Sequence, residues 1–563
     1  MNRELFGVFG GIETFERFRS SAEFDEVLRG STITVGVRDR DLGTPGWSAT
    51  YDCDDGYCFV WGEAYVPGGE RNAARWLFER FETVGLDALE MLNGSYLVVI
   101  DSDNGDSFVA TDPVRSRECF YTDEPGVRVF GTDSATVGRT ISDPMLHRDS
   151  LLEYLHLGVT LGKKTAITDL HRLPLDSRLT PNSVDSFDRF VYRPGEFDYV
   201  AELADRLDRA LQRRSSLPGQ KGLLLSAGYD SRIILSQIPD IDHTYTVGTP
   251  NAAEVRTAKR LASQYDSIHT TFPPDERYIR PDETKTRYTH GIKESLHIHH
   301  GGYTDEMGVD TMYHGLLFDT FIRGHFTADN TVDVLGKPVP TGRLDPDPDP
   351  VEVLLDKFGY TREASLQLSE QTIFDVDPEA FVRQAIADEL DSVEWRTNTV
   401  QNKLACCGIA NQPSLTFHSH LSDHFLTPFL ATDRDLLDWH LRTPPEHRTT
   451  ETFLEACKRI DGDILRHRPP DRPYEATVLN EVEGFVRRKT PFLPSFDPPW
   501  PNRESLFEQY DLDQHLLAGF DHVHPLPARH KLRVNDLREW LEWWPKSRTE
   551  PLPWLRHPES STV

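Results

Sequence analysis

Residues 222–235 constrain the fold of this chain more than any other stretch of its sequence. Leu223, Leu224 and Leu225 form a short apolar run that indicates a buried parallel strand, and a second apolar run at 233–235 has helical spacing. Between them lies a tight turn, 226–231, that reads Ser-Ala-Gly-Tyr-Asp-Ser. A strand, a small-residue loop and a helix start present backbone N–H groups to an anion. The stretch therefore predicts an α/β phosphate site.

The side chains of this turn refine the prediction. Ser226 and Ser231 can donate hydrogen bonds to phosphate oxygens, and Gly228 lets the backbone approach a ligand closely. Asp230 would repel a phosphate unless Mg²⁺ lies between the two, so we expect a nucleotide with a metal, cleaved at the site. The Gly-Lys-Ser/Thr ending of a Walker A loop is missing, which excludes that motif.

Length and charge narrow the class of protein. The chain has 563 residues, of which 38% are hydrophobic, so we expect at least two domains with real cores. Its formal net charge of −30 argues against non-specific nucleic-acid binding and suits a cytoplasm of high salt. We therefore expect a protein of a halophilic archaeon. There is no signal peptide and no apolar run near 18 residues, so we also expect a cytoplasmic protein with no membrane partner.

Cysteine and histidine spacing does not favour a metal centre. Cys53 and Cys58 could bridge or share a metal, but no second Cys or His pair stands at ligand spacing. His297 and His300 would share one face of a helix, again without an obvious carboxylate or third ligand. A polar face or the lining of a substrate pocket is the favoured interpretation for the histidines.

Residues 1–145 are β-rich, with short runs separated by Asp, Asn and Gly turns, and they predict two stacked sheets with flanking helices. Four motifs in this region resemble, in order and spacing, the glutamine amidotransferase domain of the glutamine-hydrolysing asparagine synthase family. The resemblance implies an N-terminal-nucleophile fold, whose nucleophile is a cysteine exposed immediately after the initiator Met. The motifs are Gly-Val-Phe-Gly-Gly at 7–11, Trp-Gly-Glu-Ala-Tyr at 61–65, Leu-Asn-Gly-Ser-Tyr at 92–96 and Ala-Thr-Asp-Pro at 110–113.

The same resemblance marks two losses. Matching the glycines puts Phe6 at the place of the cysteine, and Trp61 stands where the family has the Asn of its oxyanion hole, leaving Gly62. The chemistry needs a free α-amino group and a thiol on one residue, which neither Cys53 nor Cys58 can supply. We therefore expect a degenerate, structural amidotransferase-like domain without glutaminase activity.

We expect residues 146–200 to link this domain to a second one at 201–470. There the turn that begins at Ser226 resembles the Ser-Gly-Gly-x-Asp-Ser pyrophosphate loop of ATP-pyrophosphatase (PP-loop) enzymes, with Ala227 in place of the first Gly. The strand ending at Val247 and Gly248 falls where the family's backbone contacts adenine, and Glu254 opens the next helix in the family's order. The resemblance implies an α+β N-terminal-nucleophile-like sandwich followed by an α/β PP-loop synthetase domain with a helical C-terminal part.

Residues 313–325 depart from the family's pattern. Gly315 and Asp319 agree with the segment Ser-Gly-Glu-Gly-x-Asp-Glu, but Leu316 falls at the catalytic Glu and Thr320 replaces the second acidic residue. In that family the Glu is placed to handle protons as ammonia attacks an acyl-adenylate, which Leu316 cannot do. Two interpretations of Asp319 stay open: it binds Mg²⁺ or a substrate amine, or it caps a helix.

The remaining segments are less informative. Residues 330–375 look like an insertion, whose Asp-Pro repeat at 345–350 predicts an acidic exposed turn or a loop over the site. The Pro- and Trp-rich extension at 471–563 is expected to wrap the second domain, with disorder after Pro558. The family's phosphate-neutralising lysine has no counterpart, since Glu451 stands near its place. Candidate substitutes are Lys458, Arg466, Arg468 and the basic trio 487–489, for which a solvated helix end is the favoured interpretation.

Three functions follow, in decreasing order of support. The first is an ATP-dependent amide-forming ligase that uses ATP and Mg²⁺. It would activate a small-molecule carboxylate as an acyl-adenylate, release pyrophosphate, and take ammonia or a substrate amine as the nitrogen source. We expect no nucleic-acid partner and a possible homodimer. The second is a non-catalytic nucleotide-binding or scaffold protein of the same fold. The third, a PP-loop enzyme acting on tRNA, is opposed by the charge. The candidate site residues are Asp230 and Asp319 for catalysis, Asp230 for the metal, and Ser226, Gly228, Asp230, Ser231, Val247, Gly248 and Glu254 for the nucleotide.

Overall fold

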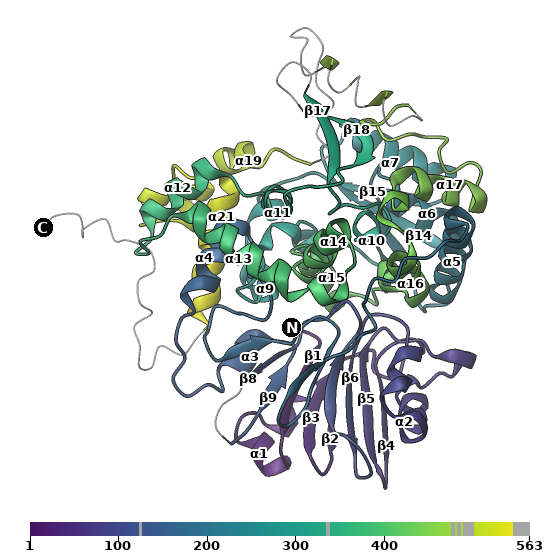
Figure 1. Cartoon of the computed structure of the whole chain (residues 1–563), viewed down its shortest axis with the longest axis vertical. Coiled ribbons are helices and arrows are strands. Elements are labelled where there is room, and N and C mark those ends of the chain that lie inside the picture. The colour runs from purple at the N-terminus through teal and green to yellow at the C-terminus, as the bar shows by residue number, and fades with distance from the viewer. Residues whose placement is uncertain are drawn as a thin grey trace, which may run out of the picture.

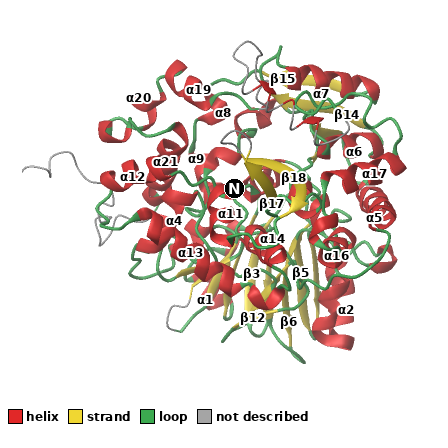
Figure 2. Cartoon of the chain, turned by 45° about the horizontal axis from the view of Figure 1, so that its top comes forward, coloured by secondary structure: helices red, strands yellow, loops and turns green. Residues whose placement is uncertain are grey.

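A computed structural model describes residues 1–122, 126–333, 338–474 and 500–543, together with residues 479, 480, 483, 486 and 487 (Figure 1). The N-terminal part forms a β-sandwich at the bottom of the view, and the helix-rich remainder lies above it. Figure 2 shows the same division by colour: most of the yellow strands lie in the sandwich, and red helices surround a smaller sheet in the other part.

The sandwich consists of two six-stranded sheets in which every neighbouring pair of strands is antiparallel. The first sheet has the order β10-β8-β9-β1-β3-β2 and the second the order β12-β11-β7-β6-β5-β4. The strands of the first are β1 (Glu4–Phe9), β2 (Glu26–Arg29), β3 (Ile33–Arg38), β8 (Phe120–Thr122), β9 (Val129–Gly131) and β10 (Leu170–Arg172). Those of the second are β4 (Ala49–Cys53), β5 (Gly56–Gly62), β6 (Tyr96–Ser102), β7 (Phe108–Thr111), β11 (Ser177–Leu179) and β12 (Val184–Ser186).

Strand β5 shows why two sheets stack. Its odd-numbered residues Tyr57, Phe59 and Trp61 belong to the core between the sheets, and Cys58 and Val60 belong to the core under α2 (Ala73–Val84). Because successive side chains of a strand point to opposite faces, a strand apolar on both sides needs a layer on each. The prediction of two stacked sheets with flanking helices is confirmed.

The outer face of the first sheet joins the two halves of the chain. Phe6 and Val8 of β1 face outward and share a core with Phe15 of α1 (Ile12–Glu16). The same core includes residues of α4 (Arg148–Leu157) and α21 (Ala528–Glu542), which come from much later in the chain.

The expectation that residues 146–200 form only a linker is wrong. Strands β10, β11 and β12 complete both sheets of the sandwich, so this segment belongs largely to the first domain. Each of these strands is three residues long, which is too short to show a period of two in the sequence.

The second half is built on a parallel four-stranded sheet in the order β15-β14-β13-β16. Strand β13 (Lys221–Leu224) lies inside the sheet. The next two strands in the chain, β14 and β15, lie on one side of it, and β16 lies on the other. In sheets of this kind a ligand crevice lies at the carboxyl ends of the strands where the order reverses, here β13 and β16. The sheet also contains β14 (Ile241–Val247), β15 (Ile268–Phe272) and β16 (Thr311–Tyr313), with α5 (Tyr199–Arg214), α6 (Asp230–Gln237) and α7 (Ala253–Gln264) before and between strands.

Helices make up most of the remaining chain, and their buried residues belong to two cores, one shared with the parallel sheet and one shared with the outer face of β1. They are α3 (Ser134–Gly138), α8 (Glu276–Ile279), α9 (Glu283–Thr289), α10 (Phe318–Phe321), α11 (Pro350–Lys357), α12 (Arg362–Gln371), α13 (Pro378–Ser392), α14 (Val400–Ala410), α15 (Leu415–His424), α16 (Arg434–Arg442), α17 (Thr450–Ile460), α19 (Arg503–Gln509) and α20 (Leu512–Leu516).

The segment expected to be an insertion begins with a hairpin of β17 (Asp329–Asp333) and β18 (Pro338–Leu344). The Asp-Pro repeat then runs into α11, where Asp349 accepts hydrogen bonds from the backbone N–H groups of Val351 and Glu352. Pro350 occupies the first helical turn, where a missing N–H costs nothing.

The C-terminal extension packs into the molecule through α21. Trp540 of this helix is fully buried, with its ring against Gly291. Residues after Pro558 lie outside the described residues. Within the part of the chain that the structure describes, no helix is both long enough and apolar enough to cross a membrane.

Candidate functional site

The turn at 226–229 lies at the carboxyl end of β13, in the crevice where the strand order reverses. Hydrogen bonds within the turn and to the first residues of α6 stabilise its conformation. The backbone N–H of Ser226 donates to the Ser231 hydroxyl at 3.2 Å, and that of Gly228 donates to the Ser226 hydroxyl at 3.1 Å. Helix α6 begins at Asp230 with no side-chain cap, so the N–H groups of its first turn face the crevice without a capping acceptor.

Glu254 holds the turn from the neighbouring helix. Its carboxylate accepts the backbone N–H of Ala227 at 2.6 Å, and burial raises its pKa. Val247 pairs with Phe272 in the sheet, and the Gly248 N–H donates to the Phe272 carbonyl at 2.9 Å. The structure thus brings Glu254, Val247 and Gly248 to the same edge of the sheet as the turn, with Glu254 as the support of the turn.

Asp230, whose side chain is 23% exposed, lies beside a guanidinium. Its Oδ1 lies 3.1 Å from Nη1 of Arg323 and has no hydrogen-bond partner among the described residues. Burial is the largest cause that raises the pKa of Asp230 to about 6. Arg323 opposes this shift, and the nearby Asp319 adds to it. The two predicted carboxylates are therefore neighbours in the crevice.

Three arginines surround Tyr229. The guanidinium carbons of Arg232, Arg472 and Arg323 lie 5.4, 5.8 and 6.0 Å from its ring centre. Arg232 is fixed by the carbonyls of Gly228 and His467, each at 2.8 Å. Together they place positive charge around the turn, as a phosphate site requires.

The sequence pattern alone does not place these three arginines at the candidate nucleotide site. Of the expected lysine substitutes, Lys458 pairs with Glu455 at 2.8 Å and Arg487 with Glu483 at 2.6 Å, while residues 488 and 489 lie outside the described residues. Arg323 stood in the matched segment 313–325. Its role depends on the short helix α10, which turns it back toward Asp230.

The loop after β16 closes the other side of the crevice. A side chain at Gly315 would place its Cβ 2.8 Å from Cβ of Asp230, so the two loops touch at this point. Leu316 is half-buried and packs against apolar cores on both sides. Asp319 is the second residue of α10, and the residue at the helix N-cap is Leu317 with φ of 67°, so the N-cap interpretation of Asp319 is wrong.

This donor set fits the phosphates of a nucleotide. It combines an uncapped helix start, two serine hydroxyls and the nearby arginines Arg323 and Arg472. Oδ1 of Asp230, which lies beside Arg323, fits a magnesium held mainly by phosphate and water, since such an ion needs only one or two protein carboxylates. The described residues contain no group of three or more His, Cys, Asp or Glu that could hold a metal by themselves.

The place of the expected histidine helix is taken by 3₁₀ turns, so the prediction of one shared helical face is wrong. Nε2 of His297 lies 3.4 Å from Glu294, and Nε2 of His300 lies 3.3 Å from Nδ1 of His420 on α15. The two rings therefore have different partners.

A second region of interest lies at the end of the sandwich, near Gly62. The Gly62 N–H donates to the Ser48 hydroxyl at 2.9 Å, and the guanidinium of Arg117 lies against the Gly62 Cα. The alignment that put Phe6 at the nucleophile's place is wrong, since Phe6 faces the opposite side of the sheet. A nucleophile must lie next to its oxyanion donors, and the residues before β1 that line a cavity with Trp61 are Met1 and Arg3.

No family model and no curated protein matches the chain. Among solved structures, it is similar to glutamine phosphoribosylpyrophosphate amidotransferase from B. subtilis complexed with ADP and GMP, with 11% identity over 67% of this chain and 94% of that chain and a TM-score of 0.21. A structure described as the allosteric regulatory enzyme of purine biosynthesis has 12% identity over 67% and 93%, with a TM-score of 0.19. At these scores the description of the fold depends on the strand order and packing given above.

Proposed function

We propose that this protein binds ATP at the carboxyl end of β13 and uses it to activate a carboxylate as an acyl-adenylate, as the amide-forming ligases of the asparagine synthase type do. The observation that carries the proposal is the turn at 226–229, held by Glu254 at the reversal of strand order, with an uncapped helix start and arginines around it. Ligands of parallel α/β sheets bind in such crevices.

The roles of the residues follow from their positions. Ser226, Ser231 and the start of α6 would bind the phosphates, and Arg323 and Arg472 would neutralise them in place of a lysine. A bound Mg²⁺, with Asp230 as its protein ligand, would offset phosphate charge. Asp319, more exposed than Asp230, faces the side from which a carboxylate or an amine would enter. Attack by the carboxylate oxygen on the α-phosphorus breaks its bond to the bridging oxygen, and pyrophosphate leaves.

For the first domain we propose that glutaminase activity is absent. The Gly62 N–H already has an acceptor in Ser48, and Arg117 fills the space beside it, so the backbone donor of an oxyanion hole is occupied. Ammonia or an amine would then come from solution or from the substrate itself.

A second function, nucleotide binding without catalysis, is favoured by one observation. Arg323 lies against the carboxylate that would hold the metal, and Leu316 stands at the place of the family's proton-handling glutamate. Such a protein would bind ATP and release no pyrophosphate.

Pyrophosphate exchange separates these functions. The wild-type chain, supplied with ATP, Mg²⁺ and a panel of carboxylic acids, is expected to exchange labelled pyrophosphate into ATP with at least one acid. Asp230→Asn should lower the rate by about 100-fold or more, because removing one oriented charge at the transition state has an effect of this size. Asp391→Asn, a change at an exposed carboxylate, is the control and should match the wild type. ATP binding without exchange for any acid would favour the non-catalytic function.

A substitution at the contact of the two loops tests the location of the site. Gly315→Ala would place a methyl group 2.8 Å from Cβ of Asp230 and 2.9 Å from N of Ser231, so the loops must separate. We expect ATP affinity, measured by calorimetry, to fall about tenfold or more, since overpacking costs ~1–3 kcal/mol. Gly308→Ala, where a methyl group would meet nothing within 4 Å, is the matched control. Equal affinity for the two variants would place the nucleotide elsewhere.

A further inference from the structure

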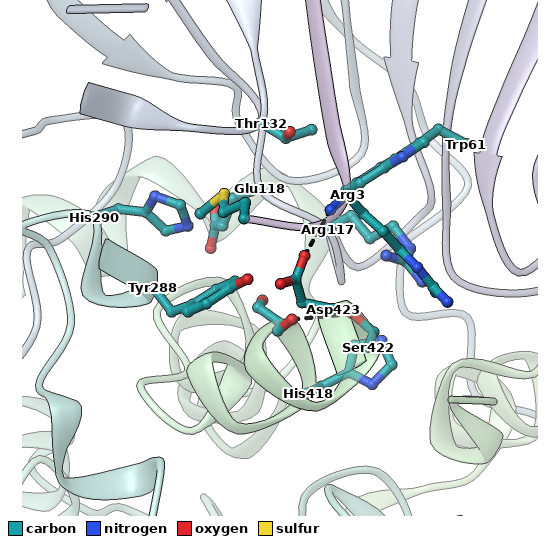
Figure 3. Close-up of a pocket in the computed structure, with 12 residues that line it drawn as sticks. Arg3, Trp61, Arg117, Glu118, Thr132, Tyr288, His290, His418, Ser422 and Asp423 are labelled. Carbon is teal, nitrogen blue, oxygen red and sulfur yellow. Dashed lines mark hydrogen bonds between the residues drawn. The ribbon is translucent and has the colours of Figure 1, made fainter. Parts of the chain in front are cut away.

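A small cavity lies between the sandwich and helix α15, well apart from the turn at 226–229. Its volume is about 40 Å³, which exceeds the roughly 10–15 Å³ that one water needs and is far too small for a nucleotide. Figure 3 shows Arg3, Trp61 and Arg117 reaching it from the sandwich, and His418, Ser422 and Asp423 on the opposite wall.

Arg117 is a buried cation without a counter-charge in contact. Its side chain is 4% exposed, its Nε donates to the Ser95 carbonyl at 2.8 Å, and its Nη2 has no hydrogen-bond partner. Within the described residues no carboxylate forms an ion pair with it, and its neighbours are the rings of Trp47 and Trp61 at 5.3 and 4.9 Å. An unpaired buried charge costs several kcal/mol, so an anion beside it would be strongly favoured.

The other charged groups at the cavity have partners of their own. Arg3 contacts Asp39 at 3.3 Å and donates to Asp41. Asp423 accepts the backbone N–H groups of Asn2 and Arg3 at 2.9 and 2.8 Å. Glu118, also in the lining, is paired with Arg172 and Lys293 at 2.7 and 2.6 Å. Arg117 is therefore the guanidinium of the lining that has no carboxylate in contact among the described residues.

Several N–H donors of the lining lack an acceptor. They are Nε1 of Trp61, Nη1 of Arg3 and Nη2 of Arg117. His418 adds a fourth: its Nδ1 lies 3.0 Å from Nε2 of His314, whose Nδ1 accepts the Leu316 N–H at 3.2 Å. His314 therefore donates to His418, and the proton of the neutral His418 ring is on Nε2, which is buried without a partner. Burial lowers the pKa of both histidines, which keeps the rings neutral.

We propose that this cavity is a binding site for a small monovalent anion of the size of chloride, held by Arg117 and by the N–H groups of Trp61, Arg3 and His418. A single negative charge compensates the single unpaired guanidinium, and a spherical anion accepts from donors that converge from several directions. The site is independent of the proposed nucleotide site, so its test does not depend on ATP.

Thermal unfolding in chloride-free buffer provides the test. Potassium chloride is titrated against potassium gluconate at constant ionic strength, and the melting temperature of the full chain is measured together with tryptophan fluorescence. The wild type should show a saturable rise in melting temperature with chloride and with bromide. Arg117→Met should lose this dependence, while Arg75→Met, at an exposed arginine of α2, should keep it.

A milder variant covers the case in which Arg117→Met does not fold. Trp61→Phe removes one donor and keeps the ring, and we expect it to weaken the apparent chloride affinity by roughly 5–20-fold, as for the loss of one hydrogen bond to a charged group. Anomalous scattering from crystals soaked in bromide should show one peak beside Arg117. A response to chloride that is linear and equal in wild type and Trp61→Phe, with only water at that position in the crystal, would overturn the proposal.

Discussion

Lowering the pH from about 7.5 to 5 is expected to unfold this protein steeply, because its folded state keeps many histidines buried and neutral. Burial lowers the pKa of His156 and His290 to about 4 and that of His314 and His530 to about 3. Four further histidines have a pKa well below the ordinary value. The eight side chains, each at most 3% exposed, are His156, His290, His300, His314, His418, His420, His440 and His530.

The sign follows from which state binds the protons. In the unfolded chain a histidine titrates near pH ~6.5. Below that pH the unfolded state therefore binds more protons than the folded state, in which these histidines stay neutral. Each such histidine then lowers the free energy of unfolding by ~1.4 kcal/mol per pH unit, which amounts to roughly 11 kcal/mol per unit for eight. Stability is present above pH ~6.5 and is lost as the pH falls.

Three carboxyl groups oppose this loss. Burial raises the pKa of Asp230 to about 6 and that of Glu153 and Asp536 to about 7, so these groups bind protons in the folded state first. Between pH ~6 and ~5 their protonation raises the free energy of unfolding by roughly 4 kcal/mol per pH unit of acidification. The net loss of roughly 7 kcal/mol per unit is about half or more of an ordinary stability of ~5–15 kcal/mol, so we expect acid unfolding with a midpoint above pH ~5.

Urea denaturation at a series of pH values and constant ionic strength measures this dependence. His420→Asn should reduce the slope by about 1.4 kcal/mol per pH unit, and His515→Asn, at an exposed position, should leave it unchanged. A free energy of unfolding that stays within about 2 kcal/mol between pH 7.5 and 5.5 would contradict the expectation, since even a few of the eight histidines would change it more.

Arg214→Met is expected to destabilise the protein by about 3–5 kcal/mol, the cost of breaking a buried ion pair from one side. Arg214 lies between Glu63 of the sandwich and Asp433 before α16, and all three side chains are fully buried. Both carboxylates raise the pKa of Arg214, although burial opposes them, and Arg214 in turn lowers that of Asp433. Methionine keeps much of the length, leaves buried Glu63 without its cation and leaves Asp433 with Arg213 alone, at 2.5 Å.

The matched control is Arg209→Met on the same helix, where the guanidinium is half-exposed and lies 3.3 Å from Asp435. Exposed pairs contribute ~0–1 kcal/mol, so the two variants should differ by at least about 2 kcal/mol in urea denaturation at pH 7. The loss in Arg214→Met should shrink at pH 5, as the stranded carboxylates take up protons. Equal stabilities of the two variants would show that the triad contributes little.

Much of the sandwich could be predicted because its longer strands, such as β5 and β6, are runs of β-branched and aromatic residues bounded by turn residues. The strands at 170–186 could not, because they are three residues long and find their places only by pairing with strands far away in the sequence. The motifs that begin at Trp61 and Leu92 include loops that contact the second half of the chain. The contacts are made by Glu63 and Asn93 of these motifs. Glu63 accepts the Phe429 N–H at 2.8 Å, and Asn93 donates to Asp433 at 3.2 Å.

The turn at 226–231 could be predicted as a candidate site because strand, loop and helix are adjacent in the sequence. The structure brings Asp230, Asp319 and Glu254 together around it, as expected from their order. The arginine cluster could not be predicted, because Arg323 and Arg472 come from segments 90 or more residues away. Their approach depends on the packing of α10 and of the chain after α17.

The Ser48 hydroxyl that accepts the Gly62 N–H also bears on how this fold could change over generations. Ser48 donates in turn to Asp39 at 2.6 Å, and the same carboxylate accepts the Trp47 indole N–H at 3.2 Å and contacts Arg3. Replacing Ser48 to free the Gly62 N–H would also take one hydrogen bond from Asp39, which Trp47 and Arg3 share. This backbone donor therefore cannot be released without disturbing a buried carboxylate and two further side chains.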